Sequence, residues 1–144
     1  MKVLLDTNIL VAALVRDHPH HSEALPWLQR IIRKEIAGAV SAHSLAEVYT
    51  VLTRALKTPP AAALLLIETN ILNHMEVVVL DGEDYHNLLK HCVGLNISGP
   101  KVYDALIGWA AWKAHVDCLV TKNKKDFDVL YPAAIAQIID PTTG

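Results

Sequence analysis

The chain has 144 residues, of which 52% are hydrophobic and 19% are charged, and its formal net charge is −2. A chain of this length is expected to form a single domain over residues 1–144, stable without disulfide bonds or a structural metal. The high hydrophobic content excludes an intrinsically disordered chain, and the near-neutral charge argues against binding nucleic acid through a basic tail alone.

Short apolar segments alternate with longer, helix-like segments along the chain. Strands are expected, in chain order, at residues 3–5, 38–41, 76–80, 118–121 and 134–138. Helices are expected at residues 9–15, 22–36, 45–56, 61–72, 85–92 and 102–115. Because the strands are apolar throughout and helices separate them, they are expected to pair in parallel, with helices on both faces. The sequence therefore predicts an α/β fold, a three-layer α/β/α sandwich with a short, mostly parallel central sheet.

The apolar runs at residues 61–67 and 77–80 are far shorter than the roughly 20 residues that a membrane-spanning helix needs. An acid at Asp6 interrupts the first apolar stretch, which is unlike a secretory signal peptide. Cys92 and Cys118 form no Cys-x-x-Cys pair and are expected to be reduced thiols. We therefore expect a soluble, cytoplasmic protein that does not contact membranes.

Acidic side chains gather near the carboxyl ends of the expected strands, where open parallel sheets bind ligands. Asp6 ends the first strand, Glu47 lies on the helix after the second, Asp104 begins the helix before the fourth, and Asp126 follows the fourth. Each has a local explanation, because three could cap or begin a helix and Asp126 could be a solvated loop charge. Taken together, the four carboxylates predict a site for a hard divalent cation, which prefers oxygen ligands and relieves their repulsion.

Four ordered segments resemble the motifs of PIN-domain ribonucleases and, within that family, of the VapC-type toxins of toxin–antitoxin pairs. The segments are Leu4–Leu10, Ser44–Val48, Tyr103–Ile107 and Leu119–Phe127. No single motif is specific, but the ordered set covers nearly the whole chain. The resemblance implies a PIN-like nuclease domain with a catalytic, metal-binding set formed by Asp6, Glu47, Asp104 and Asp126. It also implies polar support from Thr7, Asn8, Thr121 and Asn123.

One position departs from some members of the family, which carry an acid two residues after the threonine where this chain has Asn123. It stays open whether Asp126 binds metal directly or through water. The resemblance implies a Mg²⁺- or Mn²⁺-dependent endoribonuclease. A metal can activate water and neutralise phosphate charge, so in-line attack of water on phosphorus is expected. The family implies 5′-phosphate and 3′-hydroxyl products.

The resemblance also implies a cognate antitoxin protein as a partner, beside the RNA substrate. An antitoxin arginine could enter the carboxylate pocket, because its planar guanidinium pairs with carboxylates in a bidentate way. A homodimer is expected because two-fold dimers are the commonest assembly.

Lysines and histidines lie near the expected site. Lys122, Lys124 and Lys125 are either a solvated loop or a rim that holds RNA phosphates. Residues 18–21 include three histidines. No further zinc ligands lie nearby at suitable spacing, so these histidines are expected to lie in a flexible loop. Contact of that loop with RNA phosphates is the weaker of the two interpretations.

Three other functions compete on the residues alone. A PIN-domain nuclease could serve RNA processing without an antitoxin. A receiver-like signalling module could accept a phosphoryl group at Asp81, but two of the four carboxylates would then have no role. A phosphatase with Asp6 as nucleophile would need a general acid where Asn8 stands.

Overall fold

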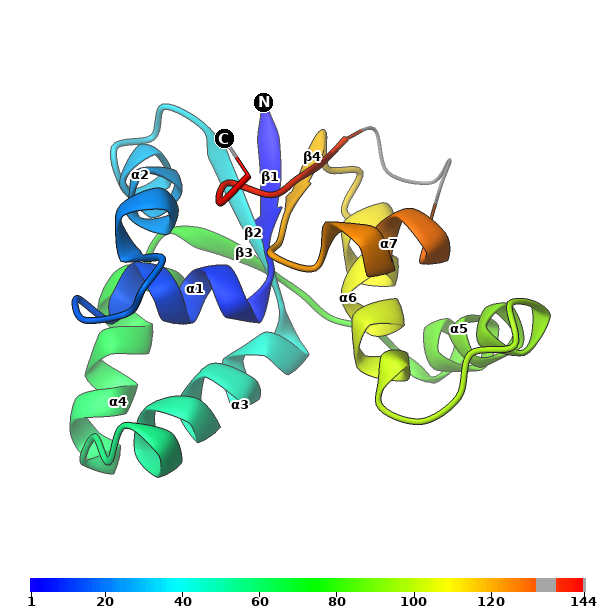
Figure 1. Cartoon of the computed structure of the whole chain (residues 1–144), viewed down its shortest axis with the longest axis horizontal. Coiled ribbons are helices and arrows are strands. Elements are labelled where there is room, and N and C mark those ends of the chain that lie inside the picture. Colours follow the sequence, from blue (N-terminus) through cyan, green and yellow to red (C-terminus); the bar gives the residue numbers. More distant parts are fainter. Residues whose placement is uncertain (132–136, 144) are drawn as a thin grey trace.

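In the computed structural model, which describes residues 1–131 and 137–143, a five-stranded sheet forms the centre of the molecule (Figure 1). Its strands are β1 (Lys2–Leu5), β2 (Ala37–Ser41), β3 (Met75–Val78), β4 (Cys118–Val120) and β5 (Ile138–Ile139). They pair in the order β3-β2-β1-β4-β5, and every pair is parallel. The last strand was predicted at residues 134–138, of which 134–136 lie outside the described residues.

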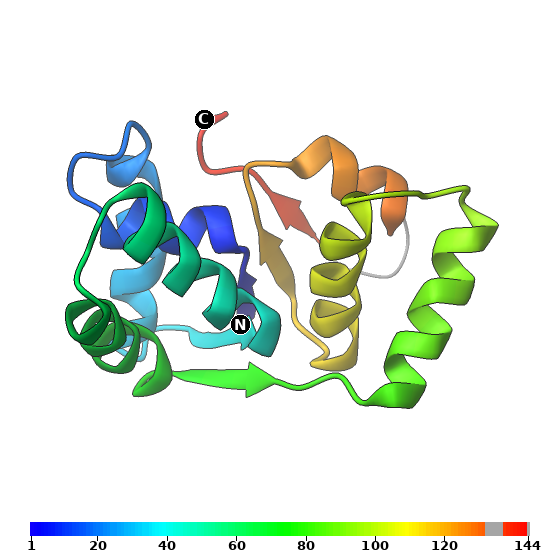
Figure 2. The same cartoon turned by 90° about the horizontal axis from the view of Figure 1, so that it is seen from below.

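Helices cover both faces of the sheet (Figures 1 and 2). One face carries α1 (Thr7–Leu14), α2 (His21–Ile32), α3 (Ala42–Thr50) and α4 (Pro60–Ile67). The π-helical turns η1 (Val51–Ala55) and η2 (Glu68–Leu72) extend α3 and α4. The other face carries α5 (Gly82–Gly94), α6 (Lys101–Lys113) and α7 (Lys124–Leu130). This arrangement confirms the three-layer α/β/α sandwich, with a sheet that is parallel throughout its described strands.

The two faces of the sheet have separate apolar cores. Val3 and Leu5 of β1 belong to the core under α1–α4, whereas Leu4 between them belongs to the core under α5–α7. All three side chains are completely buried. This burial on both faces explains why the strands are apolar throughout and do not alternate with polar residues.

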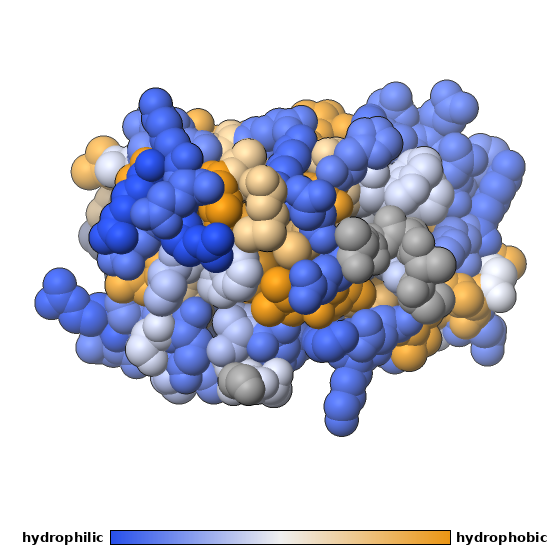
Figure 3. All heavy atoms as spheres, turned by 90° about the horizontal axis from the view of Figure 1, so that it is seen from above, coloured by the Kyte–Doolittle hydropathy of each residue, from blue (hydrophilic) through white to orange (hydrophobic). Residues whose placement is uncertain are grey.

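The outer surface differs from these cores. Seen from the edge where the N-terminus lies, it is mostly hydrophilic, with apolar side chains in smaller patches (Figure 3). No helix in the described part of the chain is long and apolar enough to cross a membrane. Cys92 and Cys118 are buried free thiols, as expected.

The order of the strands creates a crevice at the carboxyl edge of the sheet. From β1 the chain proceeds to β2 and β3 on one side, and then crosses to β4 and β5 on the other. The chain after β1 therefore runs to one face of the sheet, and the chain after β4 runs to the other face. The place where two neighbouring strands connect to opposite faces is the switch point of the sheet, and ligands bind there in open α/β folds. Asp6 follows β1 and Thr121 follows β4, so both lie at this point.

Candidate active site

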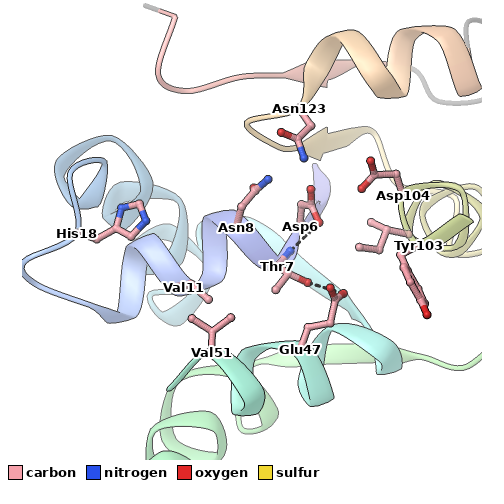
Figure 4. A pocket seen from close by; sticks show the side chains of 11 residues that line it. Asp6, Thr7, Asn8, Val11, His18, Glu47, Val51, Tyr103, Asp104 and Asn123 are labelled. Atoms are coloured by element: carbon pink, nitrogen blue, oxygen red, sulfur yellow. Dashed lines mark hydrogen bonds between the residues drawn. The ribbon is translucent and has the colours of Figure 1, made fainter. Parts of the chain in front are cut away.

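A pocket of about 330 Å³ opens at the switch point. Figure 4 shows the side chains of Asp6, Glu47 and Asp104 meeting there from the end of β1, from α3 and from α6. The polar lining as a whole consists of Asp6, Thr7, Asn8, His18, Glu47, Tyr103, Asp104 and Asn123. Three of the four predicted acids thus face a common cavity.

Asp6 is held by hydrogen bonds on both carboxylate oxygens. The backbone N–H of Thr7 donates to Oδ1 at 2.7 Å, and the hydroxyl of Thr121 donates to Oδ2 at 2.7 Å. Asp6 is also the N-cap residue of α1 and is only 3% exposed. Helix capping and a place in the pocket are therefore compatible, because one buried carboxylate does both.

Burial raises the pKa of Asp6 from 3.8 to about 6. The hydrogen bonds from Thr121 and Thr7 oppose this rise, whereas the nearby charges of Asp104 and Glu47 add to it. The buried carboxylate is thus only partly stabilised in its charged form. A bound cation would supply the missing positive charge.

Asp104, in the first turn of α6, is half-buried. Its burial raises its pKa, the carboxylates of Asp126 and Glu47 raise it further, and Lys101 acts in the opposite direction. Asp104 therefore shares with Asp6 an excess of negative charge that no side chain in the pocket neutralises.

Glu47 is oriented by the hydroxyl of Thr7, which in turn contacts the hydroxyl of Ser44. The hydroxyl oxygen of Thr7 lies 3.0 Å from Glu47 Oε1 and 2.9 Å from Ser44 Oγ. Because a hydroxyl carries one proton, Thr7 can donate to Glu47 while it accepts from Ser44. Ser44 and Glu47 have the spacing of a capping box, in which Ser44 would be the N-cap of the helix. That explanation is wrong, since α3 begins two residues earlier, at Ala42, and Ser44 lies buried inside the helix.

His43 and Tyr103 form a contact beside the pocket that no sequence pattern indicates. His43 Nε2 lies 3.4 Å from Glu47 Oε1. The rings of His43 and Tyr103 stack with their centroids 5.2 Å apart and their planes within 1°. This stack joins α3 to α6, so it fixes Glu47 relative to Asp104.

The loop after β4 is tied to the start of α1. The hydroxyl of Thr121, which donates to Asp6, accepts the backbone N–H of Asn123 at 3.0 Å. The side-chain oxygen of Asn8 accepts the backbone N–H of Lys122 at 3.3 Å. The predicted polar residues are thereby placed around Asp6.

Asp126 does not line the same pocket as the other three acids. It lies in the first turn of α7 and borders a neighbouring hollow of about 530 Å³. Asn123 lines both cavities, and the charge of Asp126 still reaches Asp104. The expectation that all four carboxylates face a single pocket is therefore corrected. The predicted basic rim borders this second hollow, with Lys122, Lys124 and Lys125.

The chemistry of the pocket fits a hydrated, hard cation. Considering residues 1–131 and 137–143, no three His, Cys, Asp or Glu side chains stand close enough to enclose a metal ion by themselves. Mg²⁺ typically keeps several waters and uses only one or two carboxylates, so it needs no such enclosure. The oxygen-rich set of Asp6, Glu47 and Asp104 suits Mg²⁺ or Mn²⁺ better than zinc.

The raised pKa of Asp6 predicts how the metal-free fold responds to pH. Between about pH 4 and pH 6 the folded Asp6 holds a proton that the unfolded chain has released, so the folded state binds more protons. The contribution of Asp6 to the unfolding free energy therefore falls as pH rises through this window, by on the order of 2–3 kcal/mol. Urea unfolding in a chelator at several pH values measures it, and a contribution that rises over this window would contradict the assignment.

Comparison with known proteins identifies the family. Residues 3–131 match the family model of the PIN domain, and the chain belongs to this family. It is 31% identical over 120 residues to ribonuclease VapC40 of Mycobacterium tuberculosis, covering 82% of this chain and 84% of that protein. It is 32% identical over 128 residues to ribonuclease VapC27 of the same organism, covering 86% of each. The resemblance predicted from the ordered motifs is thereby confirmed.

Solved structures agree with the fold. VapBC2 from Rickettsia felis, bound to a promoter DNA fragment, superposes with a TM-score of 0.69 at 23% identity, covering 97% of this chain and all of that one. VapC20 from Mycobacterium tuberculosis, a toxin that cleaves the sarcin-ricin loop, gives 0.67 at 16% identity, covering 93% and 97%.

The structure argues against the receiver-like alternative, in which Asp81 would accept the phosphoryl group. Asp81 caps α5 by accepting the backbone N–H of Asp84 at 2.8 Å, and Asp84 in turn accepts the backbone N–H of Asp81 at 2.9 Å. Asp81 follows β3, which is separated from β1 by β2. It therefore serves the start of a helix at the edge of the sheet, away from Asp6.

Proposed function

We propose that this protein is an endoribonuclease that hydrolyses RNA phosphodiester bonds with Mg²⁺ or Mn²⁺ and is the toxin of a toxin–antitoxin pair, acting in the cytoplasm. In this proposal residues 1–144 form a single PIN-like nuclease domain. The observation that carries it is the meeting of Asp6, Glu47 and Asp104 at the switch point of a PIN-family chain. The ribonuclease names of the two VapC relatives support it.

Asp6 and Asp104 would hold the proposed cation, with Glu47 on the same side of the pocket and Asp126 acting from the neighbouring hollow. When bound, such a cation lowers the pKa of water and neutralises charge on the phosphate. The raised pKa values of Asp6 and Asp104 favour this assignment, because burial and neighbouring carboxylates disfavour their charged forms and a bound cation would stabilise them.

The other polar residues orient these carboxylates. Thr7 donates to Glu47 through its hydroxyl and to Asp6 through its backbone N–H, so it spans two of the three acids. Thr121 holds the second oxygen of Asp6, while Asn8 and Asn123 line the same cavity. Lys122, Lys124 and Lys125 are proposed to contact RNA phosphates beside Asp126, because phosphate contacts position a nucleic acid without reading its sequence.

The proposed partners are RNA, a cognate antitoxin and a second copy of the chain. Two similar structures support the antitoxin: a VapBC complex from Salmonella typhimurium bound to DNA and a toxin–antitoxin complex from Klebsiella pneumoniae. A cationic antitoxin side chain in the pocket would compete with the metal for the same carboxylates.

Expression in cells tests the proposal. The wild-type chain expressed alone should arrest growth, its genomic neighbour should relieve the arrest, and Asp104→Asn should be harmless. RNA recovered after a short induction should carry new ends at a few defined positions. Harmless expression of a chain that cleaves RNA in vitro would favour the RNA-processing alternative, and the absence of both effects would refute the nuclease.

A further inference from the structure

His18 reaches the active-site pocket from the loop between α1 and α2. It lines the pocket beyond Asn8, on the side away from Asp104 (Figure 4). Backbone hydrogen bonds form turns within this loop. The backbone N–H of His18 donates to the carbonyl of Val15 at 3.0 Å, and that of His21 donates to the carbonyl of His18 at 3.0 Å.

The side chain of His21 anchors the same loop to α1. Its Nδ1 lies 2.9 Å from the carbonyl oxygen of Ala12, so the nitrogen must carry a proton to make this bond. His21 thus has a structural role, whereas His18 is the histidine that the loop presents to the pocket.

A hydrogen bond fixes the tautomer of His18. The backbone N–H of His20 donates to His18 Nδ1 at 3.0 Å, so Nδ1 must be unprotonated. The neutral ring then carries its proton on Nε2. Burial lowers the pKa of His18, and the charges of Lys122, His20 and His21 lower it further, which favours this neutral form.

The other ring nitrogen is available to a ligand. Across the part of the chain that the structure describes, no hydrogen bond engages His18 Nε2. Beside it, Asn8 uses its oxygen to accept from Lys122, so its amide N–H groups are left to donate. The pocket therefore has carboxylates on one wall and neutral donors on the other.

We propose that the Nε2–H of His18 binds a phosphate oxygen of the RNA backbone and positions the strand against the carboxylate wall. The inference rests on the proposed function, because it takes RNA as the ligand. A phosphodiester held over a cation turns its remaining anionic oxygens away from the carboxylates. A donor on the opposite wall can bind one of them, and a neutral donor adds no charge that would repel the cation. His18 is thus a positioning residue.

Two substitutions distinguish the role of His18 Nδ1, which accepts a hydrogen bond within the loop, from that of Nε2, which faces the pocket. In His18→Asn the amide oxygen can take the place of Nδ1 and accept from His20, but nothing replaces Nε2–H. In His18→Gln the longer amide can place an N–H donor near Nε2. We expect His18→Asn to raise KM for a labelled single-stranded RNA by roughly tenfold, which corresponds to about 1.4 kcal/mol, with kcat within about twofold.

His18→Gln is expected to restore KM to within about threefold of the wild-type value, even if its unfolding temperature is the lower of the two. A better KM in the less stable variant would show that His18 positions RNA. If His18 had only a structural role, activity would instead follow thermal stability. An unchanged KM in His18→Asn, or a loss confined to kcat in both variants, would overturn the inference.

A binding measurement distinguishes failure of this inference from failure of the proposed nuclease. In metal-free wild-type protein, ¹⁵N spectra of the imidazole groups should show His18 as the Nε2–H tautomer, assigned by its loss in His18→Asn. Addition of the same RNA should shift this signal. A shift without any metal-dependent cleavage would refute the proposed nuclease activity but support RNA binding by His18. Cleavage without a shift would refute RNA binding by His18 but support the nuclease activity.

Discussion

Asp6→Asn is expected to lower RNA cleavage by roughly a thousandfold or more while making the metal-free protein more stable. The loss of activity follows because an amide carries no negative charge with which to hold the cation. The gain in stability follows because the buried, poorly compensated charge of Asp6 disappears at neutral pH.

The amide can keep the hydrogen bonds that hold the carboxylate in place. Its oxygen still accepts from the N–H of Thr7, since asparagine caps helices about as well as aspartate. Its nitrogen faces the hydroxyl of Thr121, which can accept instead of donate. Removing the charge should therefore raise the unfolding free energy at pH 7.5 by about 1–2 kcal/mol and the melting temperature by roughly 3–8 °C.

Thermal unfolding in a chelator measures this gain at pH 7.5 and at pH 4. The gain should vanish at pH 4, where Asp6 of the wild type is itself protonated. Saturating Mn²⁺ should stabilise the wild type but not the variant. Glu68→Gln, the same chemical change at an exposed acid, is the matched control and should alter neither activity nor stability. A variant that is less stable at pH 7.5, or that still cleaves RNA, would contradict the account.

Gly108→Ala is expected to destabilise the protein by about 2–3 kcal/mol, because it overfills a packed contact between α6 and α7. A Cβ at this position would lie 2.1 Å from Tyr131 Cε2, far inside van der Waals contact. The ring of Tyr131 is only 3% exposed, and its hydroxyl donates to the backbone carbonyl of Ala105. It therefore has little freedom to move away from an added methyl group.

The same substitution should also impair cleavage. Ala105 directly follows Asp104, and Tyr131 ends the helix that carries Asp126, so displacing the ring separates the two carboxylates. Gly94→Ala in α5 is the matched control, because a Cβ there meets nothing within 4 Å and alanine favours helix. Urea unfolding should show loss for Gly108→Ala and no loss for Gly94→Ala; equal stability of the two would disprove the packing argument.

Much of the site follows from sequence for a simple physical reason. A parallel sheet buried on both faces has apolar strands, so the first polar residue after each strand marks the carboxyl edge. Asp6 and Thr121 were found in this way, and Asp104 follows because a helix that leads into a parallel strand begins at the same edge.

Asp126 was harder to place because α7 was missed. That helix has only seven residues, and only Phe127 and Leu130 are buried, which is too short an apolar pattern to indicate a helix. With a loop expected there, nothing indicated that Asp126 would border a second hollow instead of the main pocket.

The supporting contacts depend on tertiary structure. Ser44 and Glu47 have the spacing of a capping box, and only the packing of α1 against α3 brings Thr7 between them. The proton on His18 Nε2 follows from one hydrogen bond, which the backbone N–H of His20 donates to His18 Nδ1. That hydrogen bond exists only because of how one short loop folds. The sequence identifies such side chains as candidates, but their roles depend on hydrogen bonds that form only in the folded protein.

The central claim is that the pocket of Asp6, Glu47 and Asp104 cleaves RNA with a divalent cation. Its most direct test incubates the purified protein with end-labelled RNA in a chelator and then adds Mg²⁺ or Mn²⁺ stepwise. Asp104→Asn, purified in the same way, controls for contaminating ribonuclease. We predict no cleavage in the chelator, cleavage that rises and saturates with either ion, and none by the variant. Full cleavage in excess chelator, or equal cleavage by Asp104→Asn, would contradict the claim.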